Sequence, residues 1–143
     1  MAARQDPFGS FNFIVEIDGK TISGFSEVSG LEAEVEVVEY REGSDPMTTH
    51  KAPGLQKYAN ITLKRGITGD LTLWQWMQSV LGGNPDRRNL SIVLLNEQRQ
   101  AVARWNLVRA WPTKYIAPAL NSATSDVSLE TLEIAHEGLT RVQ

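Results

Sequence analysis

Strict alternation of apolar and polar residues is the feature that most limits how this chain can fold. The alternation is sharpest in residues 59–64, where alanine, isoleucine and leucine at every second position are separated by asparagine, threonine and lysine. A period of two places apolar side chains on one face of a sheet and polar side chains on the other. The pattern predicts a strand with one buried face that follows a turn at Pro53-Gly54 and ends at Gly66.

Similar patterns predict a protein built mainly from β-strands. The dipeptide Asp18-Gly19 lies between alternating segments and is a strong β-hairpin signal. Pro112 predicts a kink within a long strand, and the pair Val37-Val38 interrupts an alternation and so predicts a bulge or twist. The predicted strands are residues 11–17, 21–25, 31–40, 90–95, 101–116 and 127–136.

One helix is predicted for residues 69–81. Apolar residues recur there at helical spacing, Thr68 or Asp70 is placed to cap the first turn, and a glycine pair follows the last turn. Several strands with one helix predict a mainly β (α+β) fold of two packed antiparallel sheets, a sandwich or part-barrel, with the helix at one flank. We expect the helix to cover a sheet with the side that carries Trp74, Met77 and Leu81.

Residues 42–54 show no sustained period and are rich in glycine, proline and threonine, which predicts a long extended loop. Loops of about a dozen residues are uncommon inside compact domains and are often functional. We therefore regard this loop as the best candidate for an interface, the alternative being a loop that is merely mobile. The candidate residues in and just after it are Glu42, Gly43, Asp45, Met47, His50, Lys51, Pro53, Gly54, Lys57 and Tyr58.

Charge is distributed unevenly along the chain. Residues 1–45 hold ten of the 17 acidic residues and three of the 14 basic residues, although the formal net charge of the whole chain is only -3. Surfaces of opposite sign on one chain can meet on neighbouring copies and join them head to tail. The alternative is that these residues form solvated faces of a sheet.

The overall composition is that of a globular protein, with 41% hydrophobic and 22% charged residues. At 143 residues, we expect a single domain spanning 1–143. No apolar run approaches the ~20 residues that a membrane helix requires, and the N-terminus lacks the apolar core of a signal peptide. Together with the absence of cysteine, these features predict folding in a reducing compartment.

No combination of residues in the sequence has a catalytic pattern. His50 and His136 are far apart and have no cysteine partners, so a zinc site is not expected. The Gly19-Lys20-Thr21 segment lacks the earlier glycine of a phosphate-binding loop, because position 14 is isoleucine. We expect a protein that is not an enzyme, with no catalytic residue, no metal and no cofactor.

A basic stretch raises the question of nucleic-acid binding. Residues 51–65 contain four basic residues and a tyrosine but no acidic residue. Such a stripe can bind a phosphate backbone, but the whole chain is acidic, with a sequence pI of about 5.4. We expect no specific nucleic-acid or membrane binding by the subunit, and we regard acidic residues of a neighbouring copy as the better partner.

A series of motifs runs through nearly the whole chain in order. These motifs are Asp6-Pro7-Phe8, Phe11-Asn12-Phe13, Gly24–Leu31, Pro53-Gly54, Lys57–Thr68, Trp74-Gln75-Trp76 and His136–Leu139. Together they resemble the tail tube family that contractile-tailed bacteriophages share with phage-tail-like contractile injection systems. The match over Lys57–Gly66 is most similar to the inner tube proteins of the injection systems.

The resemblance implies two packed antiparallel sheets, a flanking helix and a long loop or hairpin. It also implies that six copies form a ring, and that rings stack into a hollow tube that a contractile sheath propels through a target envelope. The implied partners are further copies of the chain, the sheath, the baseplate or hub, the tape-measure protein, and DNA or protein cargo in the lumen. The implied location is a phage tail or tail-like particle that is assembled in the bacterial cytoplasm.

The resemblance also assigns candidate sites. The loop ending at Pro53-Gly54 would reach the adjacent ring, and the N-terminal motif would lie near contacts between rings. The N-terminal candidates are Asp6, Pro7 and Phe8. Three glutamates alternate along one predicted strand and could line the lumen, where negative charge would keep acidic cargo from adhering to the wall. These lumen candidates are Glu32, Glu34 and Glu36.

Two other functions stay open from the sequence. The first is a secreted Hcp-like ring of the type VI secretion kind, which would have a similar fold. The second is a monomeric β-sandwich that binds a small ligand. Its candidate site would be an aromatic cluster of Trp105, Trp111 and Tyr115.

Overall fold

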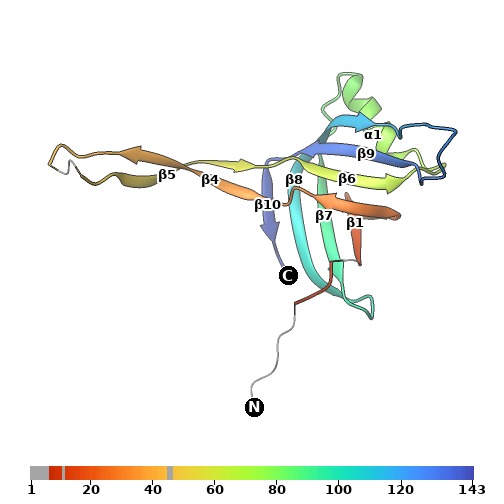
Figure 1. The fold of residues 1–143 in the computed structure, drawn as a ribbon, viewed down its shortest axis with the longest axis horizontal. Coiled ribbons are helices and arrows are strands. Elements are labelled where there is room, and N and C mark those ends of the chain that lie inside the picture. The colour runs from red at the N-terminus through yellow and green to blue at the C-terminus, as the bar shows by residue number, and fades with distance from the viewer. Residues whose placement is uncertain (1–6, 11, 45–46) are drawn as a thin grey trace, which may run out of the picture.

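The computed structural model describes residues 7–10, 12–44 and 47–143. Figure 1 shows a body of β-strands with one helix, from which a long two-stranded hairpin, here called the arm, projects to one side. The body contains β1 (Phe13–Ile17), β2 (Lys20–Ile22), β3 (Phe25–Ser29), β6 (Ile61–Gly66), α1 (Thr72–Leu81), β7 (Arg88–Leu95), β8 (Ala101–Ile116), β9 (Leu129–Ala135) and β10 (Gly138–Arg141). The arm consists of β4 (Ala33–Tyr40) and β5 (His50–Tyr58). The predicted mainly β fold with a flanking helix is confirmed.

Two antiparallel sheets make up the body, and the long strand β8 belongs to both. The strand order is β2-β1-β7-β8-β9-β6-β3, and β10 also pairs with β8. The first part of β8 pairs with β7 and β10, whereas its last part, beyond Ala110, pairs with β9. The register of β8 against β9 shifts between Pro112 and Lys114, which confirms the predicted kink. Because β8 bends from one sheet into the other, the two sheets pack face to face without closing into a barrel.

The first hairpin forms as the sequence predicts. Ile17 is opposite Lys20, so Asp18 and Gly19 form a two-residue turn, with φ angles of 50° and 79°. Positive φ at both positions is the requirement of a type I′ turn, which Asp-Gly meets at low cost. The carboxylate of Asp18 also accepts a hydrogen bond from the backbone N–H of Asn89 at 3.0 Å. The turn is thereby attached to the start of β7.

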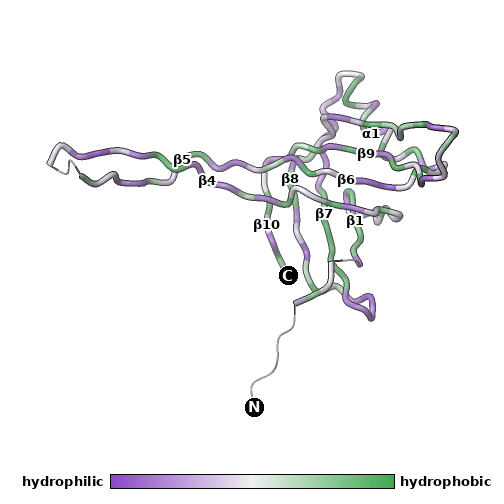
Figure 2. The backbone as a smooth tube through the Cα atoms, in the orientation of Figure 1, coloured by the Kyte–Doolittle hydropathy of each residue, from purple (hydrophilic) through white to green (hydrophobic). Residues whose placement is uncertain are grey.

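Side chains from both sheets meet in one core. In β6, Ile61 and Leu63 are fully buried while Thr62 and Lys64 between them are not, which confirms the predicted one-sided strand. Figure 2 shows apolar residues concentrated along the strands of the body, whereas polar and apolar residues alternate along the arm. The buried cluster consists of Val15, Ile17, Ile61, Leu63, Leu73, Trp76, Met77, Leu90, Ile92, Leu107, Ala110, Leu132 and Ile134.

Helix α1 covers the core with a side that matches the predicted one only at Met77. Its buried residues are Leu73, Trp76 and Met77, whereas Trp74 is 37% and Leu81 65% exposed. The helix carries apolar residues on nearly every side, so the periodicity did not distinguish between the two orientations. The predicted start is also early, since the helix begins at Thr72.

The carboxylate of Asp70 stabilises the start of α1, as predicted, although the residue at the N-cap position is Leu71. The Oδ1 atom of Asp70 accepts hydrogen bonds from the Thr72 hydroxyl at 2.6 Å and from the Thr72 backbone N–H at 3.0 Å. These two bonds, with the guanidinium of Arg65 nearby, hold the pKa of Asp70 below its usual value. The carboxylate therefore stays ionised where the first turn of the helix exposes its N–H groups.

Trp76 attaches α1 to the segment that leads into β7. Its indole N–H donates to the backbone oxygen of Asp86 at 2.8 Å, and the guanidinium of Arg88 lies over its ring at 5.1 Å. We expect Trp76→Phe to lower the free energy of unfolding by about 1–2 kcal/mol, because it removes the donor and part of the buried ring. Urea unfolding followed by circular dichroism measures this change. The matched variant Trp74→Phe should be close to neutral, and equal losses in both would contradict the assignment.

A buried ionic network lies beneath the N-terminus of α1. Arg65 in β6 donates to the Oε1 atom of Glu130 in β9 from Nε at 3.0 Å and from Nη2 at 2.7 Å. It also donates to the carboxylate of Asp70 at 2.9 Å. The Tyr115 hydroxyl donates to the other oxygen of Glu130 at 2.7 Å, and burial together with this bond raises the pKa of Tyr115 to about 12. The network joins three strands of one sheet, β6, β8 and β9, to the loop that starts the helix.

Candidate assembly interface

The arm is the part of the chain that the body covers least. Strands β4 and β5 pair only with each other, and most of their residues are exposed. The predicted loop 42–54 is therefore too long, since β5 already begins at His50. The predicted strand 31–40 does form, but as half of the arm rather than within the sandwich. Alternation along that strand reflects the two sides of a hairpin and not one buried face.

An irregularity in the middle of the arm explains Pro53-Gly54. Val35 is opposite Gln56 and Val37 is opposite Pro53, so β5 has one extra residue there. A β-carbon at Gly54 would lie 2.9 Å from the Cγ2 atom of Val38. A bulge also accommodates a proline, which has no N–H to donate. The bulge predicted near Val37-Val38 in the strand 31–40 is not found in that strand, because the extra residue belongs to β5 opposite Glu36. Pro53-Gly54 lies in this bulge and does not form the predicted turn.

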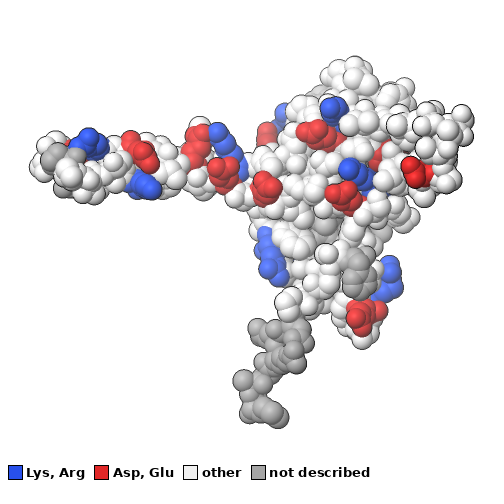
Figure 3. Space-filling model, in the orientation of Figure 1, with Lys and Arg blue, Asp and Glu red and all other residues white. Residues whose placement is uncertain are grey.

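The two sides of the arm differ in charge. One side carries Glu34, Glu36 and Lys57, and the ammonium of Lys57 forms an ion pair with Glu36. The opposite side has no charge in its middle part. We call it the neutral side of the arm, and its residues are Val35, Val37, Pro53 and Gln56. Figure 3 shows acidic and basic residues interspersed along the arm.

The base of the arm is fixed to the body by a histidine. The ring of His136, which follows β9, lies 5.4 Å from the ring of Tyr58 at the end of β5. Its two ring nitrogens lie 3.1 Å from the backbone oxygen of Ala59 and 3.2 Å from that of Gly138. The sequence predicts no such role for His136, which was considered as a metal ligand and as part of a family motif, because no local pattern connects residues 58 and 136.

A glycine allows the chain to enter the arm closely against β6. Gly30 has a φ of +92°, and a β-carbon there would lie 2.1 Å from the backbone oxygen of Asn60. The side-chain amide of Asn60 donates to Glu133 in β9 at 3.1 Å. With the His136 contacts, these features hold both strands of the arm at their base. These contacts therefore fix the direction in which the arm leaves the body.

The structure brings most of the predicted interface residues together in the arm but not all of them. Pro7 and Phe8 lie beside the turn between β7 and β8, in a depression shared with residues 95–98. Asp6 and Asp45 lie outside the described residues. Near the tip of the arm, Met47 is 95% exposed. The remaining members, all in or next to the arm, are Glu42, Gly43, His50, Lys51, Pro53, Gly54, Lys57 and Tyr58. Their contacts with another copy remain a prediction.

The three glutamates proposed for the lumen are placed in or beside the arm. Glu34 and Glu36 lie on its charged side, and Glu32 precedes β4. Glu36 is paired with Lys57, which offsets part of the negative charge. Their position in a tube remains a prediction.

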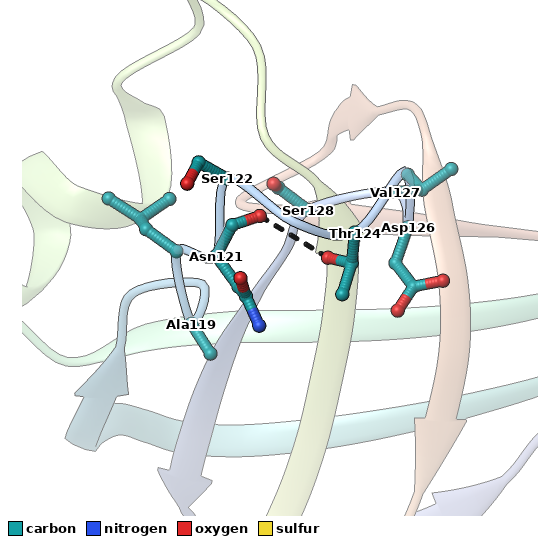
Figure 4. Close-up of a pocket in the computed structure, with 8 residues that line it drawn as sticks. Ala119, Asn121, Ser122, Thr124, Asp126, Val127 and Ser128 are labelled. Atoms are coloured by element: carbon teal, nitrogen blue, oxygen red, sulfur yellow. Dashed lines mark hydrogen bonds between the residues drawn. The ribbon is translucent and has the colours of Figure 1, made fainter.

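The described residues offer little for small-molecule chemistry. A cavity of about 770 Å³ is lined entirely by residues 119–128 of one connecting segment, and Figure 4 shows the hydrogen bond from the Thr124 hydroxyl to the backbone oxygen of Asn121 across it. Within the described ranges, no three histidine or carboxylate side chains are grouped to hold a metal ion, and no helix is long and apolar enough to cross a membrane.

The predicted aromatic cluster is spread over both sheets. Trp105 is paired with Ile92 in the first part of β8, whereas Tyr115 is paired with Leu132 in the last part. Tyr115 instead contacts Trp74 of α1, with ring centroids 5.1 Å apart. Trp105 and Tyr115 therefore lie in different sheets.

Comparison with known families identifies the family of the chain. Residues 9–140 match the family described as T4-like virus tail tube protein gp19. This chain belongs to the tail tube family. No functionally curated protein matches the chain. The resemblance found in the sequence motifs is thereby confirmed over nearly the full length.

Solved structures with a closely similar fold come from an extracellular contractile injection system. A chain of the extended sheath-tube complex of PVC, an extracellular contractile injection system, is 26% identical, with a TM-score of 0.87 over 95% of this chain and 91% of that one. A chain of the PVC sheath/tube terminator is also 26% identical, with a TM-score of 0.90 over 99% and 100% of the two chains. Hcp1 from Flavobacterium johnsoniae is more distant, at 16% identity and a TM-score of 0.58 over 92% and 94%, and shows a shared fold alone.

Proposed function

We propose that this tail tube protein is the subunit of the inner tube of an extracellular contractile injection system. The observation that carries the proposal is its similarity, at 26% identity over 95% of the chain, to a chain of the PVC sheath-tube complex. In this role six copies form a ring, and the rings stack into a hollow conduit for protein cargo or DNA. The subunit is a structural component of a tail-like particle and not an enzyme.

The proposed partners follow from the same relatives. The similar chains come from a sheath-tube complex and from a sheath/tube terminator, which supports a contractile sheath and a terminating cap as neighbours of the tube. A baseplate or hub and a tape-measure protein complete the particle. We place its assembly in the bacterial cytoplasm and treat residues 1–143 as one tail-tube domain.

Features of the described residues support assembly through the sheets and the arm. Strands β2 and β3 end the strand order of the body, so each has one edge that no described strand covers. Pairing such edges between neighbours removes unpaired backbone groups that would otherwise promote aggregation. The arm extends away from the body and is suited to contact a further ring. Its interface residues and the lumen position of Glu32, Glu34 and Glu36 belong to this proposal.

Negative-stain electron microscopy of the purified protein, at several concentrations and salt conditions, tests the proposal directly. We expect hollow rings with sixfold symmetry, and tubes at high concentration or after co-expression with the sheath. Light scattering on the same samples gives the mass of the rings in solution. Monomers under every condition, including co-expression, would contradict the proposal. Free rings that never stack would favour the Hcp-like alternative.

A further inference from the structure

Helix α1 has no charged residue on the side that faces away from the core. Its sequence from Thr72 to Leu81 contains no Asp, Glu, Lys or Arg. Leu71, Trp74, Gln78 and Leu81 are spaced three or four residues apart, so they share one side. Leu71 and Leu81 are 55% and 65% exposed. A helix that carries apolar residues on nearly every side is normally covered on most of them, and this side is not covered within the described part of the chain.

The uncharged surface continues from α1 onto the segment between β8 and β9. Trp74 contacts Tyr115 at the end of β8, and the backbone N–H of Ile67 donates to the backbone oxygen of Ser128 at 3.0 Å. Leu120 is 87% exposed and Val127 is 79% exposed. Residues 66–85 and 115–129 together form this surface, which we call the neutral face.

Charges are scarce on the neutral face. Asp70 and Asp126 are its only charged residues, and the carboxylate of Asp70 is already bound to Arg65 at 2.9 Å. Figure 3 shows the region around α1 and the neighbouring end of the body as largely uncharged surface. Depletion of charge combined with exposed aromatic and aliphatic side chains is typical of the central part of a protein interface. The occupant of this face must itself present an uncharged surface.

The same chain presents such a surface on the arm. The neutral side of the arm exposes Val35 to 47% and Val37 to 61%, and these residues are paired with Gln56 and Pro53. A two-stranded hairpin is marginally stable without a covering layer, so the arm also needs a partner. The arm and the neutral face lie at opposite ends of the molecule, which prevents one copy from covering its own face (Figure 1).

We propose that the neutral side of the arm of one copy packs on the neutral face of a second copy. The contact joins two different surfaces and is therefore head to tail. Each copy can bind one neighbour through its arm and another through its neutral face, so the contact can repeat along a series of copies. The uncharged part of that side runs along β4 from Ala33 to Val37, five residues or about 16 Å, which matches the roughly 15 Å of a ten-residue helix. This inference rests on the proposed function of the chain as a tube subunit and specifies the surface that receives the arm.

Site-specific cross-linking tests the contact, because the chain has no cysteine. Val37→Cys is mixed with a second variant that carries Leu71→Cys or Leu81→Cys, one at each end of α1, and a short bis-maleimide is added after assembly. Cross-linked dimers can form in these mixtures only between copies. The matched control is Val38→Cys, which is 50% exposed and lies on the opposite side of the arm.

We expect several-fold more mixed dimer with Val37→Cys than with Val38→Cys, for at least one of the two positions on α1. All variants change exposed residues, and circular dichroism and electron microscopy verify that each one folds and forms tubes. Tubes that assemble normally but show equal or absent cross-linking from the two arm positions would overturn this inference alone. A wild-type chain that never forms rings or tubes would overturn the proposed function and this inference with it.

Discussion

Replacing Arg65 by methionine is expected to lower the free energy of unfolding by about 3–5 kcal/mol. The side chain of Arg65 is 3% exposed and that of its partner Glu130 is 4% exposed. Without the guanidinium, the carboxylate of Glu130 stays buried with the Tyr115 hydroxyl as its remaining donor. Removing one member of a buried pair is costly because the other charge is left uncompensated. Urea unfolding followed by circular dichroism measures the loss.

Two control variants separate the buried network from a general effect of removing charge. Lys64 is adjacent in sequence but 39% exposed, and its ion pair with Glu27 has an N···O distance of 3.4 Å. We expect Lys64→Met to cost about 1 kcal/mol or less, because exposed pairs contribute little. The double variant Arg65→Met/Glu130→Met should recover most of the lost stability, since neither charge is then left alone. A double variant as unstable as Arg65→Met would contradict this account.

Removing the outer part of the arm is expected to abolish tubes while leaving the body folded. Val35 and Gln56 are directly opposite each other, so residues 36–55 can be replaced by Asn-Gly, which favours a two-residue hairpin turn. The deleted residues contribute nothing to the buried core of the body. The melting temperature should therefore change little, whereas electron microscopy should show no tubes.

A matched variant keeps the arm and removes only its exposed ion pair. In Lys57→Gln the pairing of β4 with β5 is unchanged and the contact with Glu36 is lost. We expect this variant to form tubes like the wild type, because exposed ion pairs add little to stability. Tubes of normal dimensions from the shortened chain would show that the arm is dispensable for assembly. Loss of tubes in both variants would indicate that the ion pair itself is required.

Local patterns were sufficient to predict most of the elements. Asp18-Gly19 specifies its turn through backbone preferences alone, and the alternation in β6 correctly separates buried Ile61 and Leu63 from their neighbours. Pro112 marks the place where β8 changes its register with β9. These features depend on residues that are adjacent in sequence, so they can be recognised without knowledge of the fold.

The candidate site was predicted only in outline. Residues 42–54 were recognised as an interface candidate, but the arm that carries them is longer than that loop and includes all of β4. The anchoring of its base by His136 and Gly30 was missed, although both lie in segments that resemble the tail tube family. His136 contacts Ala59, which is 77 residues away in the sequence, and Gly30 lies against Asn60, which is about 30 residues away. A pattern within a short stretch of sequence cannot reveal contacts over such separations.

The sequence by itself determined the family, the mainly β composition and the approximate positions of most strands, but not those of β3, β5 and β10. Tertiary structure alone decided which side of α1 is buried, because apolar residues surround that helix and packing against the sheets selects Trp76 over Trp74. It also decided that residues 33–40 leave the body as half of an arm. Alternation is the same for a strand that covers a core and for one that forms a free hairpin, so burial depends on which other strands pair beside it.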